Sequence, residues 1–285
     1  MQQFVNHNGE ILPNATPLLT ADNRSFQYGD GLFETIRFVK GVPLFFEDHF
    51  HRLLSGMMLL QMKFDGAFDM NYFAEQIGAL CRQNQHEQAA RVRLTFYRKA
   101  GGYYTPEVNE NGFVIQTEAL PEATFDVQPK GLKIDIYKET PKQPGRFANL
   151  KTANCLVYIL AGLYKKQKGL DDCLILNTSG AIVESISSNI FIVRQGVLYT
   201  PSLSDGCVAG IMRMQILKIA RQNNKKVIEK SISPDELLLA DEVFLTNAIT
   251  GIRWVVAFRN KRYFNTTAKW FVELLNKHAA MVLPL

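Results

Sequence analysis

The first part of the chain mixes strand and helix patterns. FETIRFV (33–39) alternates apolar and polar positions as a strand does, whereas EDHFHRLLSGMMLL (47–60) carries apolar residues at helical spacing. A second helix is predicted over about 69–83, and RVRLTFYR (91–98) and GFVIQTE (112–118) are predicted strands. Residues 1–119 are therefore predicted to form a small α+β domain.

The next stretch, LPEATFDVQPKG (120–131), has two prolines, a glycine and little periodicity, which is typical of a linker. Beyond it strands dominate, and a few helices lie between them. Pro234 follows Ser233 and precedes Glu236, which predicts a capping box and a helix start. Residues 132–285 are predicted to form a larger, mostly antiparallel pseudo-barrel with peripheral helices, so the fold class is α+β with two domains.

Composition narrows the choice of partners. The formal net charge is +5, but Lys and Arg are scattered among Asp and Glu, so no nucleic-acid partner is expected. No apolar stretch approaches the ~20 residues that span a bilayer, so no membrane partner is expected either. The four cysteines are widely spaced without a CxxC pair, which argues against a metal or disulfide framework and fits the cytoplasm.

Three features suggest chemistry when they are taken together. Glu184 ends an apolar run in VESISSNIFIV (183–193), where a buried carboxylate needs a partner. Lys151 comes just before an apolar helical segment. GCVAGIMRMQI (206–216) opens from small residues directly into a helix, and TNAITG (246–251) is another small polar turn; free backbone N–H groups at such places suit a phosphate. A lysine, a carboxylate for a pyridinium nitrogen and anion cradles predict a pyridoxal phosphate site.

Each feature alone has a simpler explanation. A lysine on a loop is usually a solvated charge, and a strand-end glutamate is usually in a surface salt bridge. Most glycine-plus-helix starts are ordinary turns. The combination therefore carries the prediction.

Three stretches are similar to the signatures of a known family. ESISSNIFIVRQGVLYTPSLSDGCVAGIMR (184–213) has the expected Glu, Asn, aromatic, Thr and closing small-apolar-x-basic group in order. FQYGDGLFETIR (26–37) and NLKTANCLVYILA (149–161) agree with it. The chain thus resembles the class-IV aminotransferases, which are fold-type-IV pyridoxal-phosphate enzymes.

The resemblance implies roles for particular residues. Lys151 corresponds to the Schiff-base lysine, and Glu184 is expected at the pyridinium nitrogen. The residues expected around the cofactor phosphate are Arg52, Ile211, Met212, Asn247 and Ala248. The resemblance also implies a homodimer with the site between the two domains. One position departs from the family: a Tyr, or in some lyases an Arg, usually follows the lysine and contacts the phenolic oxygen, and KTANC (151–155) offers Cys155.

The sequence contains features of more than one reaction of this family. YTPSLSDGCVAGIMR (199–213), LLLADEVFLTNA (237–248) and RKAGGYY (98–104) resemble 4-amino-4-deoxychorismate lyases, and the last makes Arg98 a candidate carboxylate binder. Tyr28 is a further candidate substrate contact. Arg93, in RVRL, stands where branched-chain aminotransferases bind a carboxylate, and FETIR with Glu34 is also aminotransferase-like; Arg93 could equally point to solvent. The favoured function is the lyase. The alternatives are an aminotransferase of branched-chain L-amino acids or of D-amino acids, and a catalytically silent cofactor-binding homologue.

Overall fold

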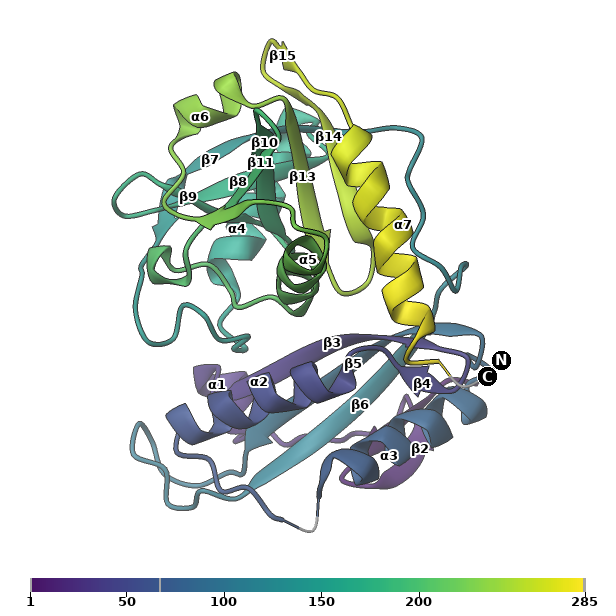
Figure 1. Cartoon of the computed structure of the whole chain (residues 1–285). Helices are drawn as coiled ribbons and strands as arrows, with labels where there is room; N and C mark the ends of the chain where they lie inside the picture. Colours follow the sequence, from purple (N-terminus) through teal and green to yellow (C-terminus); the bar gives the residue numbers. More distant parts are fainter. Residues whose placement is uncertain (1, 67, 284–285) are drawn as a thin grey trace. The chain divides into compact units, whose positions relative to one another are not determined.

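The computed structural model describes residues 2–66 and 68–283, and the chain divides into two compact units (Figure 1). Unit one comprises Met1–Ala123, Leu150–Asn154 and Ala279–Leu285, and unit two comprises Thr124–Asn149 and Cys155–His278. The first boundary lies inside the predicted linker. The sequence did not predict that the short segment with Lys151 would join the first unit.

Unit one contains a six-stranded antiparallel sheet in the order β2-β1-β6-β5-β3-β4. The long central strands are the ones that the alternating pattern predicted, and they extend one or two residues further. The strands are β1 (Phe4–His7), β2 (Glu10–Pro13), β3 (Gly31–Val39), β4 (Val42–Pro43), β5 (Ala89–Arg98) and β6 (Asn111–Ala119).

Three helices accompany this sheet: α1 (Arg24–Tyr28), α2 (Phe46–Leu59) and α3 (Met70–Gln83). Apolar residues of α2 and α3 form one buried core with alternate residues of β3, β5 and β6, such as Ile36, Val92 and Phe113. Alternation along β3 sends Phe33 and Thr35 to the opposite face from Ile36. The face that α2 and α3 leave uncovered is therefore the one that carries Phe33.

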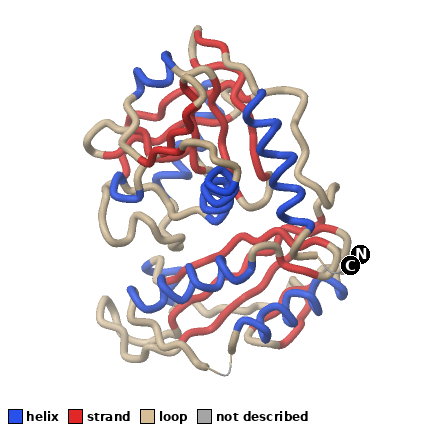
Figure 2. The backbone as a smooth tube through the Cα atoms, viewed as in Figure 1, coloured by secondary structure: helices blue, strands red, loops and turns tan. Residues whose placement is uncertain are grey.

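Unit two contains a nine-stranded sheet that Figure 2 shows as a curled set of strands. Its main path is β12-β11-β10-β13-β14-β7-β8-β9, and β15 pairs with β14. Five pairs are antiparallel; β11–β12, β14–β7 and β7–β8 are parallel. The strands are β7 (Leu132–Lys142), β8 (Asp172–Asn177), β9 (Ile182–Ser185), β10 (Asn189–Arg194), β11 (Val197–Thr200), β12 (Val227–Glu229), β13 (Glu242–Asn247), β14 (Gly251–Phe258) and β15 (Lys261–Arg262).

Helices pack outside this curled sheet, while aliphatic residues of the strands fill its inside. The helices are α4 (Leu156–Lys168), η1 (Leu203–Asp205), α5 (Ile211–Gln222), α6 (Pro234–Leu239) and α7 (Thr266–Ala280). The predicted capping box of α6 is present, with Ser233 and Glu236 each bonded to the other's backbone. The predicted α+β fold class is confirmed. No helix in the described part of the chain is long and apolar enough to cross a bilayer.

Candidate active site

Lys151 is held at the start of β3 in unit one. The backbone N–H of Phe33 donates to the Lys151 carbonyl at 2.9 Å, and the N–H of Ala153 donates to the Gly31 carbonyl at 2.9 Å. The Lys151 side chain is half-buried, and its Nζ lies 4.4 Å from the centroid of the Phe33 ring. A strand-like pairing of two segments thus presents this amine over an aromatic ring.

Arg93 lies over the same ring. Its guanidinium carbon is 3.8 Å from the Phe33 centroid, and the register pairs Arg93 with Thr35 on the neighbouring strand. The sequence left open whether Arg93 points to solvent; it is half-buried against Phe33. Two cations within 4.4 Å of one ring attract an anion such as a substrate carboxylate.

The opposite face of β3 carries a buried charge cluster. Glu34 accepts hydrogen bonds from Arg52 and from His49 Nδ1, which lies 2.7 Å from Glu34 Oε2. Burial alone would raise the pKa of Glu34, but the Arg52 charge and the His49 hydrogen bond outweigh it and lower the pKa to about 2. An ionised carboxylate only accepts, so His49 carries its proton on Nδ1. Arg52, a predicted phosphate ligand, is thus oriented by Glu34.

In unit two, the structure shows which groups of the chain pair with the Glu184 carboxylate. The carboxylate is buried, and Oε1 accepts from Lys142 Nζ at 2.6 Å and from the Tyr158 hydroxyl at 2.8 Å. Oε2 accepts from the backbone N–H of Val208 at 2.9 Å. Among the described residues, the carboxylate therefore has an ammonium, a phenol and a backbone amide as partners.

A bulge in β9 directs Glu184 to this position. The pairing register with β8 shifts between Ile182 and Glu184, so Val183 is an extra residue. Ile182 packs inside the curled sheet, whereas Val183 packs in the cluster beneath α4. Strict alternation would return Glu184 to the inner core; the bulge instead leaves it on the α4 side, next to Tyr158.

The helix start that is predicted to bind the phosphate follows Val208, whose N–H donates to Glu184. Helix α5 begins after Gly210 without a side-chain cap, which leaves the N–H groups of Ile211 and Met212 outside any side-chain cap bond. A Cβ on Gly210 would come within 1.9 Å of the Asn189 Oδ1 atom, so the backbone approach here requires glycine. Asn189 Nδ2 also donates to the Val208 carbonyl. The uncapped helix start and the glycine approach fit an anionic group.

The second predicted turn lies at the same end of the sheet. Asn189 of β10 pairs with Thr246 of β13, and Asn247 follows immediately. The Asn247 amide donates to Ser188 Oγ, and its Oδ1 accepts from the N–H groups of Ile249 and Thr250. Asn247 thus shapes the turn, and Ala248 lies within it.

Arg98 is placed differently from the prediction. It is buried, and its three nitrogens donate to Asp30, Asn109 and the carbonyls of Leu60 and Gln61. These contacts favour a structural role over substrate binding. Asp30 in turn accepts from Arg24, so Arg98 helps to hold Arg24 in place.

Sequence reasoning missed Lys142 and Tyr158. A lysine before glutamine and proline at a strand end carries no distinctive signal. Tyr158 has a weak one, because it shares a helical face with Ala161 and Tyr164, which lie in or against the buried cluster under α4. Cys155 immediately precedes α4 and makes no side-chain cap bond there. Within residues 2–66 and 68–283, no group of three or more His, Cys, Asp or Glu could hold a metal ion.

Unit one thus presents a half-buried lysine, and unit two presents a buried carboxylate next to a helix start without a side-chain cap. Residues 31–258 match the family described as Amino-transferase class IV, and the chain belongs to this family. Its members use pyridoxal 5′-phosphate, so this chain is a pyridoxal-phosphate-dependent enzyme.

Similar proteins span several activities. An aminodeoxychorismate lyase of Bacillus subtilis (strain 168) is 29% identical over 86% of this chain and 83% of its own length. A D-alanine aminotransferase of Bacillus licheniformis is 27% identical over 86% of this chain and 84% of its own. The structure of a branched-chain aminotransferase from the thermophilic archaeon Thermoproteus uzoniensis, determined with norvaline, has a TM-score of 0.86 at 22% identity and covers 97% of this chain and 94% of that one.

Proposed function

We propose that the enzyme is a 4-amino-4-deoxychorismate lyase, which releases pyruvate and leaves 4-aminobenzoate for folate synthesis. The observation that carries this proposal is an exposed aromatic surface in the unit that holds Lys151. Breaking the ring–oxygen bond of the substrate with loss of a ring proton balances without oxidant or water. A planar ring product suits an aromatic binding surface.

The aromatic surface is formed by Tyr28 and Tyr104, and contacts with Arg24 hold it in place. The rings of Tyr28 and Tyr104 lie 5.6 Å apart, and the Arg24 guanidinium lies 5.1 Å from the Tyr28 centroid. Buried Arg24 also donates to the carbonyls of Gly101, Gly102 and Tyr103, and Tyr104 is 91% exposed. The half-buried ring of Tyr28 ends α1, and the exposed ring of Tyr104 follows a loop that Arg24 holds by hydrogen bonds, so little entropy is lost when these rings bind a ligand.

This surface is linked to the lysine segment by short contacts. The side chain of Asn154, three residues after Lys151, donates to the carbonyl of Gly29, which follows Tyr28. Tyr28 is therefore the sequence-predicted substrate contact that the local geometry supports best. We assign the substrate carboxylate to Arg93, which shares Phe33 with Lys151, and not to Arg98.

The remaining roles follow the chemistry of each group. Pyridoxal phosphate, when bound, supplies an electron sink for negative charge that develops at the substrate α-carbon. We assign the movement of the α-proton to the Lys151 amine and the pairing with the ring nitrogen to Glu184. Arg52 and the backbone of Ile211, Met212, Asn247 and Ala248 are assigned to the phosphate.

An aminotransferase is the second candidate. Arg93 lies beside Phe33 and Lys151, where a carboxylate-binding arginine of a branched-chain aminotransferase would be useful, and D-amino acids share that carboxylate. The third reading of the sequence, a catalytically silent homologue, does not agree with membership of a family of pyridoxal-phosphate enzymes or with the presence of both Lys151 and Glu184.

A paired assay decides between the lyase and the aminotransferase. We expect purified enzyme with pyridoxal phosphate to convert aminodeoxychorismate to 4-aminobenzoate at least about tenfold faster, by kcat/KM, than it converts any L- or D-amino acid to its keto acid. A tenfold ratio corresponds to about 1.4 kcal/mol of transition-state discrimination. Rapid transamination of leucine or D-alanine without 4-aminobenzoate overturns the lyase proposal in favour of the second candidate. No turnover of either class, with cofactor bound, refutes both candidates.

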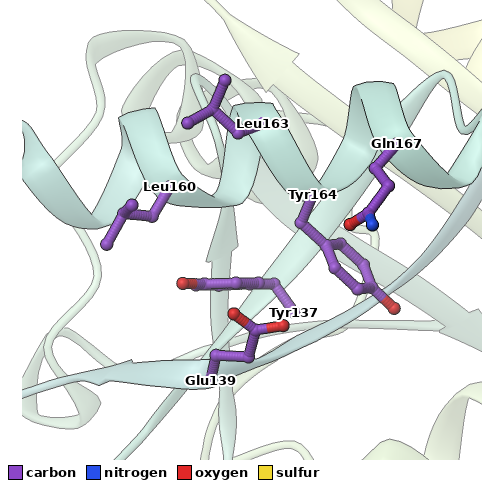
Figure 3. Close-up of a pocket in the computed structure, with 6 residues that line it drawn as sticks. All are labelled: Tyr137, Glu139, Leu160, Leu163, Tyr164 and Gln167. Carbon is purple, nitrogen blue, oxygen red and sulfur yellow. The ribbon is translucent and has the colours of Figure 1, made fainter.

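We also propose that two copies associate through helix α4. Leu156, Ile159, Leu160 and Leu163 are 74%, 55%, 43% and 60% exposed and form one apolar stripe. The stripe is symmetric about its centre, so an antiparallel second copy would place Leu156 against Leu163, as a two-fold axis requires. A hollow of about 340 Å³ beside it (Figure 3), lined by Tyr137, Glu139, Leu160, Leu163, Tyr164 and Gln167, offers room for a partner side chain.

Ile159→Glu tests this association. We expect the wild type to have twice the chain mass of 32.3 kDa by light scattering, and the variant to have the single-chain mass at micromolar concentration. Burial of a charge without a partner in an apolar contact opposes association. Lys168→Glu changes an exposed residue of the same helix outside the stripe and should leave the mass doubled. A wild type of single-chain mass, or a variant that stays doubled, refutes the proposed surface.

A further inference from the structure

The contacts of Glu184 extend beyond the residues that the family signature assigns to the cofactor. They come from three separate places in unit two: Lys142 at the end of β7, Tyr158 in the first turn of α4, and the Val208 amide before α5. We infer that Lys142 and Tyr158 are positioning residues that hold the Glu184 carboxylate, offset its charge and thereby set how strongly it retains a proton on the ring nitrogen of the cofactor. This inference rests on the proposed role of Glu184.

Lys142 is the stronger of the two groups. Its side chain is 13% exposed and that of Glu184 is 4% exposed, so the pair lies largely out of water. The Lys142 ammonium also donates to the carbonyl of Ala148 at 2.8 Å and lies 5.5 Å from the centroid of the Tyr158 ring. It is thus fixed by a second hydrogen bond and does not depend on Glu184 alone for its position.

Tyr158 adds a neutral donor to the same oxygen. Burial, followed by the charge of Glu184, raises the pKa of the Tyr158 phenol, so it remains a donor throughout the working pH range. The other titratable groups that act on this phenol are the thiols of Cys155 and Cys207. Burial raises the pKa of Cys207 to about 11, so that thiol stays neutral near pH 7. The charges in direct contact within the cluster are therefore one carboxylate and one ammonium.

The Lys142 ammonium already offsets the charge of Glu184, which affects any further cation that pairs with this carboxylate. A protonated ring nitrogen would be a second positive charge beside a carboxylate that already has a counter-ion. Like charge disfavours the charged form, so Lys142 lowers the pKa of the ring nitrogen relative to a site without it. Tyr158 acts in the same direction, less strongly, because a carboxylate that accepts an additional hydrogen bond is a weaker partner.

The test measures the ring nitrogen directly. Holoenzyme is reconstituted with pyridoxal phosphate carrying ¹⁵N in the ring, and the ¹⁵N chemical shift is followed against pH in wild type, Lys142→Met, Lys142→Arg and Tyr158→Phe. We expect Lys142→Met to raise the ring-nitrogen pKa by about 1 unit or more and Tyr158→Phe to raise it by less. Lys142→Arg keeps the charge and should restore the wild-type titration.

A cofactor analogue with carbon in place of the ring nitrogen supplies a second readout. We expect Lys142→Met to increase the rise in Tm that pyridoxal phosphate produces, but not the rise that the carbon analogue produces. Titrations that coincide in wild type, Lys142→Met and Tyr158→Phe overturn the inference. If Lys142→Met does not fold, the Tyr158→Phe titration decides alone. The expected shifts without formation of 4-aminobenzoate would refute the lyase assignment and leave the inference standing.

Discussion

Lys151→Ala is expected to lower kcat by about 10⁴-fold or more, because one amine both anchors the cofactor and moves the α-proton. The Lys151 side chain is half-buried over Phe33, and backbone hydrogen bonds pair the segment that carries it with β3. The visible absorbance of the holoenzyme should change with the loss of activity. After borohydride reduction, mass spectrometry should find the cofactor on the peptide with Lys151 in wild type and nowhere in the variant.

Lys166→Ala is the matched control, since Lys166 is an exposed lysine of α4. It should keep wild-type kcat and absorbance. A Lys151→Ala enzyme with more than a tenth of wild-type kcat would contradict the assignment of Lys151. Added methylamine that restored part of the variant's rate would support the proton-moving role, since a free amine can take the vacated place in the transfer.

Glu34→Gln is expected to destabilise the protein by about 3 kcal/mol at pH 7, because it removes the carboxylate that pairs with the buried His49 and with the largely covered guanidinium of Arg52. The lowered pKa of Glu34 leads to the same magnitude. A carboxyl lowered from 4.5 to about 2 contributes about 3 kcal/mol when it is ionised. Urea unfolding followed by fluorescence and circular dichroism measures the change in the free energy of unfolding.

The pH dependence of this difference has a definite sign. Because the folded-state pKa of Glu34 lies below its unfolded value, the stabilisation is fully present above about pH 4.5 and is lost as pH falls towards about 2. The difference between wild type and Glu34→Gln should therefore be constant from pH 5 to 7 and should shrink below pH 4.5. Glu47→Gln, a change at an exposed position of α2, the helix that carries His49 and Arg52, should cost less than about 0.5 kcal/mol. A Glu34→Gln cost that is equally small would show that the cluster is not a stabilising one.

The two charge clusters use carboxylates in different ways. In unit one, Glu34 accepts hydrogen bonds from Arg52 and thereby orients this predicted phosphate ligand. In unit two, Glu184 is itself the predicted ligand and is supported by Lys142 and Tyr158. Both carboxylates are buried, and both are matched by a cation from another element. A buried carboxylate without a partner would be strongly destabilising, so each apolar strand can carry one only because a cation pairs with it.

The sequence by itself determined the fold class and most of the helices and strands, because hydrophobic periodicity is a local property. The alternation over 33–39 predicted β3, and the Ser-Pro-x-Glu pattern predicted the start of α6. The family signature identified Lys151 and Glu184 as candidates, since each lies in a stretch whose residue order is distinctive.

Tertiary structure decided which groups meet. Lys142 is 42 residues from Glu184, and no spacing rule connects a strand end to a bulged strand across that distance. The bulge at Val183 is a property of the pairing with β8, so the direction of Glu184 could not be read from alternation. Arg98 shows the opposite case. An arginine beside a glycine loop suggested a binder of the substrate carboxylate, but in the fold its nitrogens donate to Asp30, Asn109 and two backbone carbonyls. Burial and hydrogen-bond saturation depend on segments far apart in the chain, and only the folded structure brings those segments together.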